Sequence, residues 1–231
     1  MYLDAATHRS VINLLNMKIF LDTADYEAIS ERYETGLVDG ITTNPTLVRK
    51  SGVNYLDFIK TLASEFQFES ISAEVDGNTD VEMIRNAQQY IEVGENVTIK
   101  LPLTKDGLSA CKVLTDDGIE TNVTLCFSAA QAVMAAKAGA TYISPFVGRM
   151  NDNSFSGVEL VRAISGLYCA HGVRTKILAA SLRDVHHVSR CFLYGASVCT
   201  LPPAVFDKMY NHVLTDSGLA IFEKDFKEIN G

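Results

Sequence analysis

Residues 95–107, ENVTIKLPLTKDG, contain the unit from which the fold of this chain can be inferred. Apolar Val97 and Ile99 alternate with Thr98 and Lys100, and the polar end of the stretch leads into a helical pattern. Alternating β-branched residues followed by such a pattern predict a strand and then a helix. The stretch also places a charged side chain, that of Lys100, within a strand that otherwise has the pattern of a buried one.

The same pairing of a short apolar run with a helical pattern recurs along the chain every 20–25 residues or so. The expected strands cover residues 18–22, 39–43, 70–75, 96–101, 121–126, 141–146, 176–181 and 197–201. The expected helical segments cover residues 24–33, 55–66, 81–91, 107–114, 128–139, 157–169, 183–195 and 203–213, with a last amphipathic segment at 218–229.

Strict alternation of strands and helices implies parallel strands. Eight such units in about 200 residues predict a (β/α)8 TIM barrel with a C-terminal helix. A doubly wound sheet is the alternative architecture. No strand is followed by GxGxxG, and no GxxxxGK[ST] occurs, so the nucleotide-binding forms of that architecture lack their signature.

Length and composition favour one soluble domain. The chain has 231 residues, is 47% hydrophobic and contains only 5 prolines, which leaves little material for an interdomain linker. We expect residues 1–16 to be an extension outside the core and residues 17–231 to form the barrel domain. Residues 1–16 lack the apolar core of a signal peptide.

Charge and cysteine content narrow the class of partner and the compartment. A net charge of −8 argues against a nucleic-acid or anionic-membrane surface, but leaves room for a small anionic substrate. No apolar run approaches the roughly 18–20 residues of a membrane span. The five cysteines are odd in number and form no CxxC pair, which predicts a reduced, cytoplasmic protein.

Polar residues stand repeatedly at the carboxyl ends of the expected strands, where the active sites of barrels lie. A polar side chain on a buried strand carries a desolvation cost unless it has a partner, so a recurrence on seven of eight strands indicates a site. These residues are Asp22, Thr42, Thr43, Asn44, Glu74, Lys100, Asn122, Thr124, Ser144 and Ser181.

Lys100 is the residue from which a chemistry can be inferred. Burial disfavours an ammonium, and a neutral amine in a pocket is what Schiff-base formation with a carbonyl requires. Asp22 and Glu74 are carboxylates on nearby strands that could move protons. The alternative is that Lys100 forms a structural pair with a core carboxylate, such as Glu74, or reaches solvent at the strand end.

Several of the other polar residues also have a structural alternative. Asp22 could cap the next helix, and Asn44 could be an ordinary turn residue before Pro45. Asn122 and Thr124 share one face of their strand, although Thr124 could reflect β-propensity alone.

An anion site is predicted after the sixth and seventh strands. Arg149 follows SPFVG, and Ser181 and Arg183 lie within AASLRD. The phosphate sites of barrels form in the later loops, where arginine side chains converge. Ser181 could instead cap a helix together with Asp184, and either arginine could be a solvated surface charge.

Two patterns that resemble metal sites are rejected. DNSFSG, residues 152–157, opens like a calcium loop, but Ala163 stands where a bidentate glutamate is required. His186 and His187 are adjacent on a helical pattern, so their rings should point apart. We therefore expect no metal site.

Taken together, the motifs resemble the transaldolase family in the short form that it shares with fructose-6-phosphate aldolases. The resemblance covers residues 17–226 and is specific because many motifs combine. They are FLDTAD, GITTNPTLV, ISAEV, TIKLPLTKDGL, NVTLCFSAAQA, ATYISPFVGRMND and ILAASLRD. The resemblance implies a (β/α)8 barrel with a Schiff-base lysine on the fourth strand, which is the strand of Lys100.

The resemblance also implies a role for each matching residue. Lys100 would form the imine with a ketose phosphate, Asp22 would move the proton of the sugar hydroxyl, and Glu74 would act through a water held by Thr124. The three-carbon unit would be held by Asn44, Asn122 and Ser144, and the phosphate by Arg149, Ser181 and Arg183. No cofactor is implied, because the protonated imine is the electron sink.

Three positions separate the two activities within the family. Fructose-6-phosphate aldolases carry glutamine, alanine and tyrosine where this chain has Glu74, Ser144 and Phe146. The resemblance therefore favours a transaldolase acting on sugar phosphates, with the aldolase or a barrel that only binds sugar phosphates as alternatives. It also implies a homo-oligomer, a pentamer or decamer, with the apolar side of the C-terminal segment against a partner surface.

Overall fold

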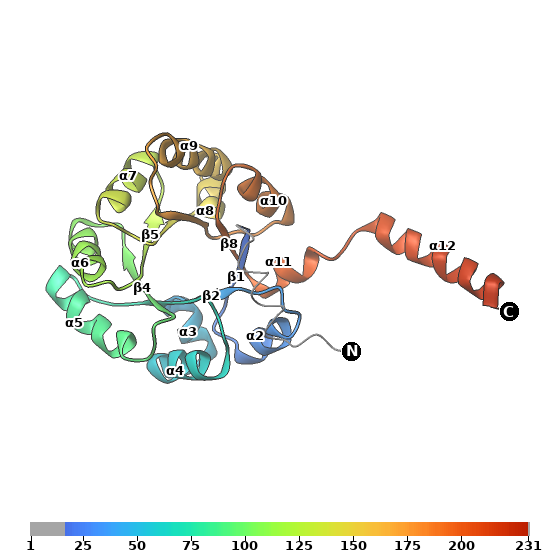
Figure 1. The fold of residues 1–231 in the computed structure, drawn as a ribbon, viewed down its shortest axis with the longest axis horizontal. Helices are drawn as coiled ribbons and strands as arrows, with labels where there is room; N and C mark the ends of the chain where they lie inside the picture. Colours follow the sequence, from blue (N-terminus) through green and yellow to red (C-terminus); the bar gives the residue numbers. More distant parts are fainter. Residues whose placement is uncertain (1–16, 231) are drawn as a thin grey trace.

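The chain forms a closed barrel of eight parallel strands, shown in Figure 1 as a computed structural model that describes residues 17–230. The strands pair in chain order, and β1 pairs with β8 to close the ring. Closure confirms the predicted barrel and excludes a doubly wound sheet. The strands are β1 (Lys18–Asp22), β2 (Gly40–Thr42), β3 (Ser70–Glu74), β4 (Val97–Pro102), β5 (Thr121–Cys126), β6 (Tyr142–Pro145), β7 (Lys176–Ala179) and β8 (Val198–Leu201).

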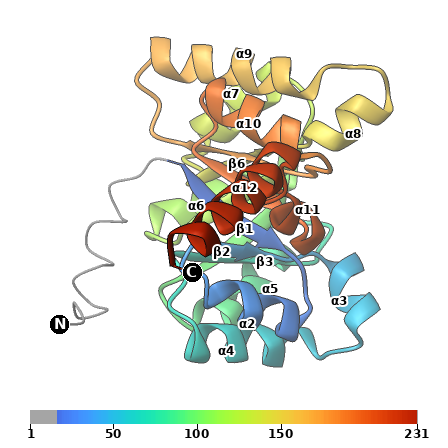
Figure 2. The same ribbon diagram turned by 90° about the vertical axis from the view of Figure 1, so that its right-hand side faces the viewer.

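Helices surround this ring, and Figure 2 shows them from the side. They are α2 (Tyr26–Tyr33), α3 (Pro45–Ser51), α4 (Tyr55–Glu65), α5 (Asp80–Ile91), α6 (Lys105–Asp116), α7 (Ala129–Lys137), α8 (Val147–Asp152), α9 (Gly157–Ala170), α10 (Val185–Leu193), α11 (Pro203–Lys208) and α12 (Val213–Asn230). The prediction about residues 1–16 lies outside the described residues.

Capping side chains decide where several helices begin, and they rule out the capping roles that the sequence left open for Asp22 and Ser181. Asp25, not Asp22, caps α2 by accepting from the N–H of Ala28. Asp184, not Ser181, caps α10. Asp22 and Ser181 therefore lack the structural roles that the sequence left open for them.

Two short helices, α3 and α8, were not expected from the sequence. Asn44 caps α3 by accepting from the N–H of Leu47, and Pro45 takes the first helical position, where its missing N–H is not needed. The Asn-Pro pair was therefore a helix signal and not only a turn signal. No side chain caps α8, which leaves no comparable signal in the sequence.

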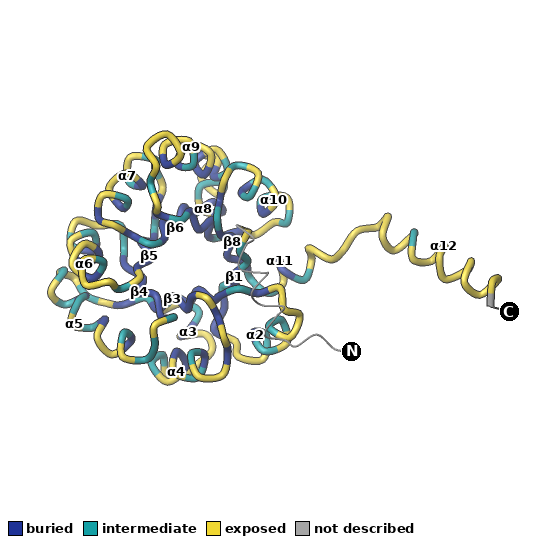
Figure 3. Tube along the Cα trace, in the orientation of Figure 1, coloured by how far each residue is buried: buried dark blue, intermediate teal, exposed yellow. Residues whose placement is uncertain are grey.

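The apolar residues of the chain form two cores. Val97, Ile99 and Leu101 belong to the large core between the barrel and the helices. Inside the barrel, a smaller apolar cluster contains Phe20, Tyr142, Leu178, Ala180 and Val198. Figure 3 shows the resulting ring of buried strands inside partly exposed helices.

The C-terminal helix α12 lies apart from this packing. Figures 1 and 3 show it extending away from the barrel, with its length exposed. Its large apolar side chains, including Leu219, Phe222 and Phe226, are all more than half exposed in the described chain. Within residues 17–230, no helix combines the length and apolarity that crossing a membrane requires.

Candidate active site

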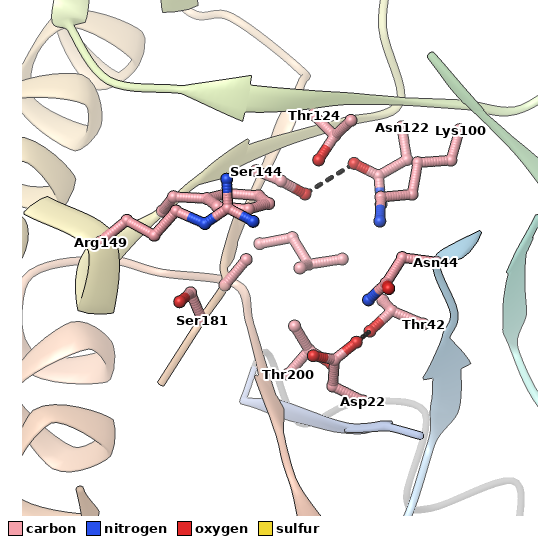
Figure 4. A pocket seen from close by; sticks show the side chains of 13 residues that line it. Asp22, Thr42, Asn44, Lys100, Asn122, Thr124, Ser144, Arg149, Ser181 and Thr200 are labelled. Atoms are coloured by element: carbon pink, nitrogen blue, oxygen red, sulfur yellow. Dashed lines mark hydrogen bonds between the residues drawn. The ribbon is translucent and has the colours of Figure 1, made fainter. Parts of the chain in front are cut away.

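A cavity of about 110 Å³ opens at the carboxyl ends of the strands. It brings together nine of the eleven residues predicted for the site, all of which except Phe146 are labelled in Figure 4. The two predicted residues outside its lining are Glu74 and Arg183. The lining consists of Asp22, Thr42, Asn44, Lys100, Asn122, Thr124, Ser144, Phe146, Arg149, Leu178, Ala180, Ser181 and Thr200.

Lys100 lies inside the barrel with only 6% of its surface exposed. Its Nζ atom is 2.9 Å from Glu74 Oε2 and donates a hydrogen bond of 3.0 Å to the carbonyl oxygen of Thr43. Parallel register sets Lys100 between Glu74 of β3 and Asn122 of β5. A buried ammonium is thus paired with one carboxylate and one carbonyl, and it reaches the cavity. Lys100 and Glu74 thus form the structural ion pair that the sequence left open as an alternative, and the same arrangement is suited to a nucleophilic amine.

Asp22 ends β1 and belongs to a short hydrogen-bonded chain. Its Oδ1 atom accepts from the hydroxyl of Thr42 at 2.9 Å, and the hydroxyls of Thr42 and Thr200 are 2.7 Å apart. Burial raises the pKa of Asp22, while the charge of Lys100 and the hydrogen bond from Thr42 oppose that rise. A carboxylate with a raised pKa is suited to accepting and returning a proton.

Polar side chains from β5 and β6 form another wall of the cavity. Ser144 Oγ donates to Asn122 Oδ1 at 2.7 Å, and Asn122 Nδ2 donates to Ser72 Oγ at 3.2 Å. Asn122 and Ser144 are therefore held in place before any substrate binds. Thr124 Oγ1 is buried and has no hydrogen-bond partner among the described residues. A buried, unpartnered hydroxyl in a cavity is a candidate contact for a ligand or a water.

Backbone irregularities lie beside this wall. The register of β5 against β6 shifts between Val123 and Cys126, and Leu125 has φ +65°. Ser181, which lines the cavity after β7, has φ +58°. Residues other than glycine rarely adopt this left-handed region, and such positions cluster at functional sites.

The predicted anion side is only partly assembled in the cavity. The guanidinium of Arg149 lies over the ring of Phe146, with its Cζ 5.0 Å from the ring centroid. Arg183 is half exposed and its Nη1 atom is 2.6 Å from Asp152 Oδ1. Arg183 is therefore a surface charge in this structure, which is the alternative that the sequence left open.

Gly148 brings the predicted anion residues close together. A Cβ atom at Gly148 would lie 2.0 Å from the carbonyl oxygen of Ser181 and 3.2 Å from Nε of Arg183. Only a glycine permits this contact between α8 and the segment after β7. The sequence signal for this approach was a single glycine, which could not be assigned a partner before the fold was known.

Sequence reasoning missed two residues that contact the predicted ones, Thr200 and Tyr55. Thr200 hydrogen-bonds to Thr42, the carbonyl of Thr43 holds Lys100, and the hydroxyl of Tyr55 contacts both Thr43 and the backbone of Glu74. Thr42 and Thr43 were noted as polar strand-end residues without a role. Nothing local marks Thr200 or Tyr55, because their importance depends on neighbours far away in sequence.

The described part of the chain contains no cluster of metal ligands. Among residues 17–230, no group of three or more His, Cys, Asp or Glu side chains is placed to hold a metal ion. The rings of His186 and His187 lie 6.0 Å apart on α10. The cavity offers an amine, carboxylates, hydroxyls and an amide for chemistry.

The fold and the site define the class of protein: a closed barrel of parallel strands with a buried lysine on its fourth strand, paired with Glu74, in a polar cavity that Asp22 also lines. Comparison with known proteins identifies the family within this class. The profile of the family described as "Transaldolase/Fructose-6-phosphate aldolase" matches residues 19–230. The chain belongs to this family, as its motifs indicated.

Relatives about half identical to this chain support the same assignment. A protein of Dinoroseobacter shibae named "Probable transaldolase" is 50% identical over 212 residues, which is 92% of this chain and 97% of that protein. Proteins with the same name from Paracoccus denitrificans and Caulobacter vibrioides are each 50% identical over 210 residues, 91% of this chain and 96% of theirs. The similarity therefore extends over nearly the whole length of these relatives.

Proposed function

We propose that this protein is a transaldolase, a transferase that moves a dihydroxyacetone unit from a ketose phosphate to an aldose phosphate. The donors would be sedoheptulose 7-phosphate or fructose 6-phosphate, and the acceptors glyceraldehyde 3-phosphate or erythrose 4-phosphate. These are reactions of the pentose phosphate pathway. The observation that carries the proposal is the position of Lys100, a buried amine that lines a polar cavity and contacts Glu74.

The first step is the formation of an imine on Lys100. Glu74 is close enough to take a proton from Nζ, which frees the amine to attack the ketose carbonyl carbon. The resulting carbinolamine loses water after its hydroxyl accepts a proton, which Glu74 can return. Thr124 would hold a water through which Glu74 acts, and its buried hydroxyl, which has no partner in the described chain, supports this role.

The second step breaks a carbon–carbon bond. Asp22 takes the proton of the hydroxyl on the carbon beyond the bond that breaks, and the bonding electrons flow into the protonated imine. An aldose phosphate leaves, and a dihydroxyacetone enamine stays on Lys100. The raised pKa of Asp22 fits this role, because the carboxylate must hold the proton until it is returned to the acceptor aldehyde.

Substrate hydroxyls and phosphate occupy different parts of the cavity in this proposal. Asn44, Asn122 and Ser144 would hold the hydroxyls of the three-carbon unit, and Arg149 with Ser181 would bind the phosphate. Arg183 would join them only if it exchanges or shares its partner Asp152. A guanidinium and a hydroxyl that both face the cavity favour an anionic group at that end.

Phe146 favours transfer over simple aldol cleavage. Its ring lines the cavity under Arg149 and has no hydroxyl that could protonate the enamine. The enamine should then persist until an aldehyde phosphate arrives. The name of the relatives, probable transaldolase, agrees with this choice.

The proposal is tested by trapping the imine with borohydride in the presence of fructose 6-phosphate. We expect a reduced three-carbon adduct on the peptide that contains Lys100, and none on Lys18, which is also largely buried. The variant Lys100→Met should form no adduct. Absence of an adduct on wild-type Lys100 would reject catalysis and leave a barrel that only binds sugar phosphates.

The choice between transferase and aldolase is tested by the need for an acceptor. With fructose 6-phosphate alone, we expect at most one release of glyceraldehyde 3-phosphate per site, and with erythrose 4-phosphate added, continuous turnover. Phe146→Tyr supplies the missing phenol and should increase release without acceptor. Rapid, continuous release by the wild type without acceptor would assign the aldolase activity instead.

Compartment and assembly complete the proposal. A cytoplasmic location fits the five cysteines, none of which forms a disulfide in the described chain. A homo-oligomer fits α12, where Leu219, Phe222, Phe226 and Ile229 recur at spacings of three and four residues and are exposed. In this assembly α12 would pack on a neighbouring copy, in a ring of five or a pair of such rings.

A further inference from the structure

Among the described residues, two oxygen atoms contact the amine of Lys100, and one hydroxyl contacts both of the residues that supply them. The carboxylate of Glu74 and the carbonyl oxygen of Thr43 contact Nζ at 2.9 and 3.0 Å. The hydroxyl of Tyr55 lies 2.6 Å from Thr43 Oγ1 and accepts the backbone N–H of Glu74 at 2.7 Å. Tyr55 is the first residue of α4 and does not line the cavity.

The direction of each hydrogen bond follows from the donors present. The hydroxyl of Thr43 donates to the carbonyl oxygen of Ser72 at 2.9 Å, so its single hydrogen is committed there. Tyr55 must therefore donate its own hydrogen to Thr43 while it accepts from Glu74. Burial raises the pKa of Tyr55, so the phenol keeps the proton that this arrangement requires.

We propose that Tyr55 is a positioning residue for Lys100, acting through Thr43 and Glu74. Its hydroxyl connects the end of β2 to the end of β3, which are the two chain segments that supply the partners of Nζ. Without it, the N–H of Glu74 loses its acceptor and the carboxylate is less firmly held on the amine. The catalytic meaning of this role rests on the proposed function, but the positioning itself does not.

The ring of Tyr55 supplies a matched control. It packs against Tyr90 of α5, with the ring centroids 5.5 Å apart. Tyr55→Phe and Tyr90→Phe each remove one phenolic oxygen and keep an aromatic ring in the same cluster. Only the first change removes contacts to Thr43 and Glu74, so a difference between the two variants isolates those contacts.

The first test measures how fast acetic anhydride labels Lys100 at fixed pH, read by peptide mass mapping. In Tyr55→Phe the amine is less firmly paired, so we expect labelling of Lys100 to rise roughly two- to tenfold, the factor that one lost hydrogen bond represents. Lys18 is the internal control, because it is buried in ion pairs with Asp39 and Glu69 and is not contacted by Tyr55. In Tyr90→Phe both lysines should react as in the wild type.

The second test uses catalysis and should move in the opposite direction. Because Glu74 no longer sits firmly on the amine, we expect kcat for dihydroxyacetone transfer to fall roughly two- to tenfold in Tyr55→Phe, with KM changed less than kcat. If wild-type Lys100 forms no imine while Tyr55→Phe still labels Lys100 selectively, the proposed function fails and the positioning role stands.

Two results would overturn the proposal. One is equal labelling of Lys100 in Tyr55→Phe and Tyr90→Phe, and the other is faster labelling of Lys18 together with Lys100, which would show general loosening of the barrel.

If Tyr55→Phe does not fold, Thr43→Val tests the same hydrogen-bond network at its other end. It removes the acceptor of the Tyr55 hydroxyl, keeps the Thr43 carbonyl, and should also increase labelling of Lys100 but not of Lys18.

Discussion

Asp22 and Lys100 are ionisable groups that the barrel holds away from water, and each needs compensation. Lys100 has a carboxylate and a carbonyl within 3.0 Å. Among residues 17–230, Asp22 has a single hydroxyl donor at 2.9 Å, from Thr42, and the more distant charge of Lys100. Asp22 is therefore the less well compensated of the two, and the rise in its pKa reflects this.

A raised pKa makes Asp22 a source of instability near neutral pH. The folded chain holds the Asp22 proton to higher pH than the unfolded chain does, so stability falls as pH rises from the ordinary aspartate pKa through the raised one. We expect Asp22→Asn to abolish transfer and raise Tm at pH 7 by about 2–4 °C, the shift that about 1 kcal/mol causes in a chain of this size. Thermal melts between pH 4 and 8 measure it.

The gain from Asp22→Asn should shrink as pH falls toward 4, because the folded wild type then protonates Asp22 and no longer buries its charge. Asp25→Asn is the control. Asp25 is an exposed helix cap only three positions away, and asparagine caps about as well as aspartate. The Asp25→Asn variant should therefore have the Tm of the wild type. A Tm for Asp22→Asn at or below that of the wild type at pH 7 would contradict the expectation.

Individual elements of the barrel differ in how tightly they meet their neighbours. Strand β2 is only three residues long and begins with Gly40. A Cβ atom at Gly40 would lie 2.6 Å from the carbonyl oxygen of Ser70 and 2.7 Å from the ring of Phe20. The glycine thus leaves room for Phe20, which fills the barrel interior below the site together with Tyr142.

We expect Gly40→Ala to destabilise the fold by about 1–3 kcal/mol, the range for overpacking a close-packed core. Gly166→Ala provides the contrast. Gly166 lies inside α9, where an added Cβ atom would meet nothing within 4 Å, so alanine should stabilise by about 0.5–1 kcal/mol. Urea unfolding of both variants measures the two effects, and Gly40→Ala at wild-type stability would show that β2 can shift away from Phe20.

At the scale of the whole molecule, α12 is the helix that extends away from the barrel and leaves its apolar side chains exposed in the described chain. Eighteen residues form the helix, and its apolar side chains remain exposed. An apolar stripe of this length, separate from the barrel core, is typical of a surface that becomes buried on assembly. A second copy of the chain offers the simplest partner, because the same helix is then covered in every copy.

We expect the double variant Phe222→Glu and Phe226→Glu to reduce the oligomer to monomers or smaller species, measured by sedimentation equilibrium. Both side chains are more than 60% exposed in the single chain, so the barrel itself should keep its secondary structure. Val81→Glu places an acid at another exposed apolar residue, on α5, and should leave the assembly unchanged. A wild-type chain that sediments as a monomer would reject the assembly.

Much of the fold was predictable because its signals are local. Residues 95–107 show the alternation of β4, Ser128 and Gly139 mark the two ends of α7, and each expected strand overlaps an observed one. The two missed helices, α3 and α8, are only seven and six residues long. Elements this short contain too few residues for a periodic pattern to distinguish a helix from a loop.

The sequence by itself determined the eight repeating units, the lysine on the fourth strand and the family motifs around it. Only the tertiary structure decided which side chains meet, because Tyr55 reaches Thr43 and Glu74, and Thr200 reaches Thr42, across gaps in the chain that carry no periodic signal. It also showed Arg183 paired with Asp152 outside the cavity lining. The physical reason is long-range pairing: strand patterns depend on near neighbours in sequence, whereas the partners of Lys100 depend on the register of neighbouring strands, and the contact of Thr42 with Thr200 depends on closure of the ring.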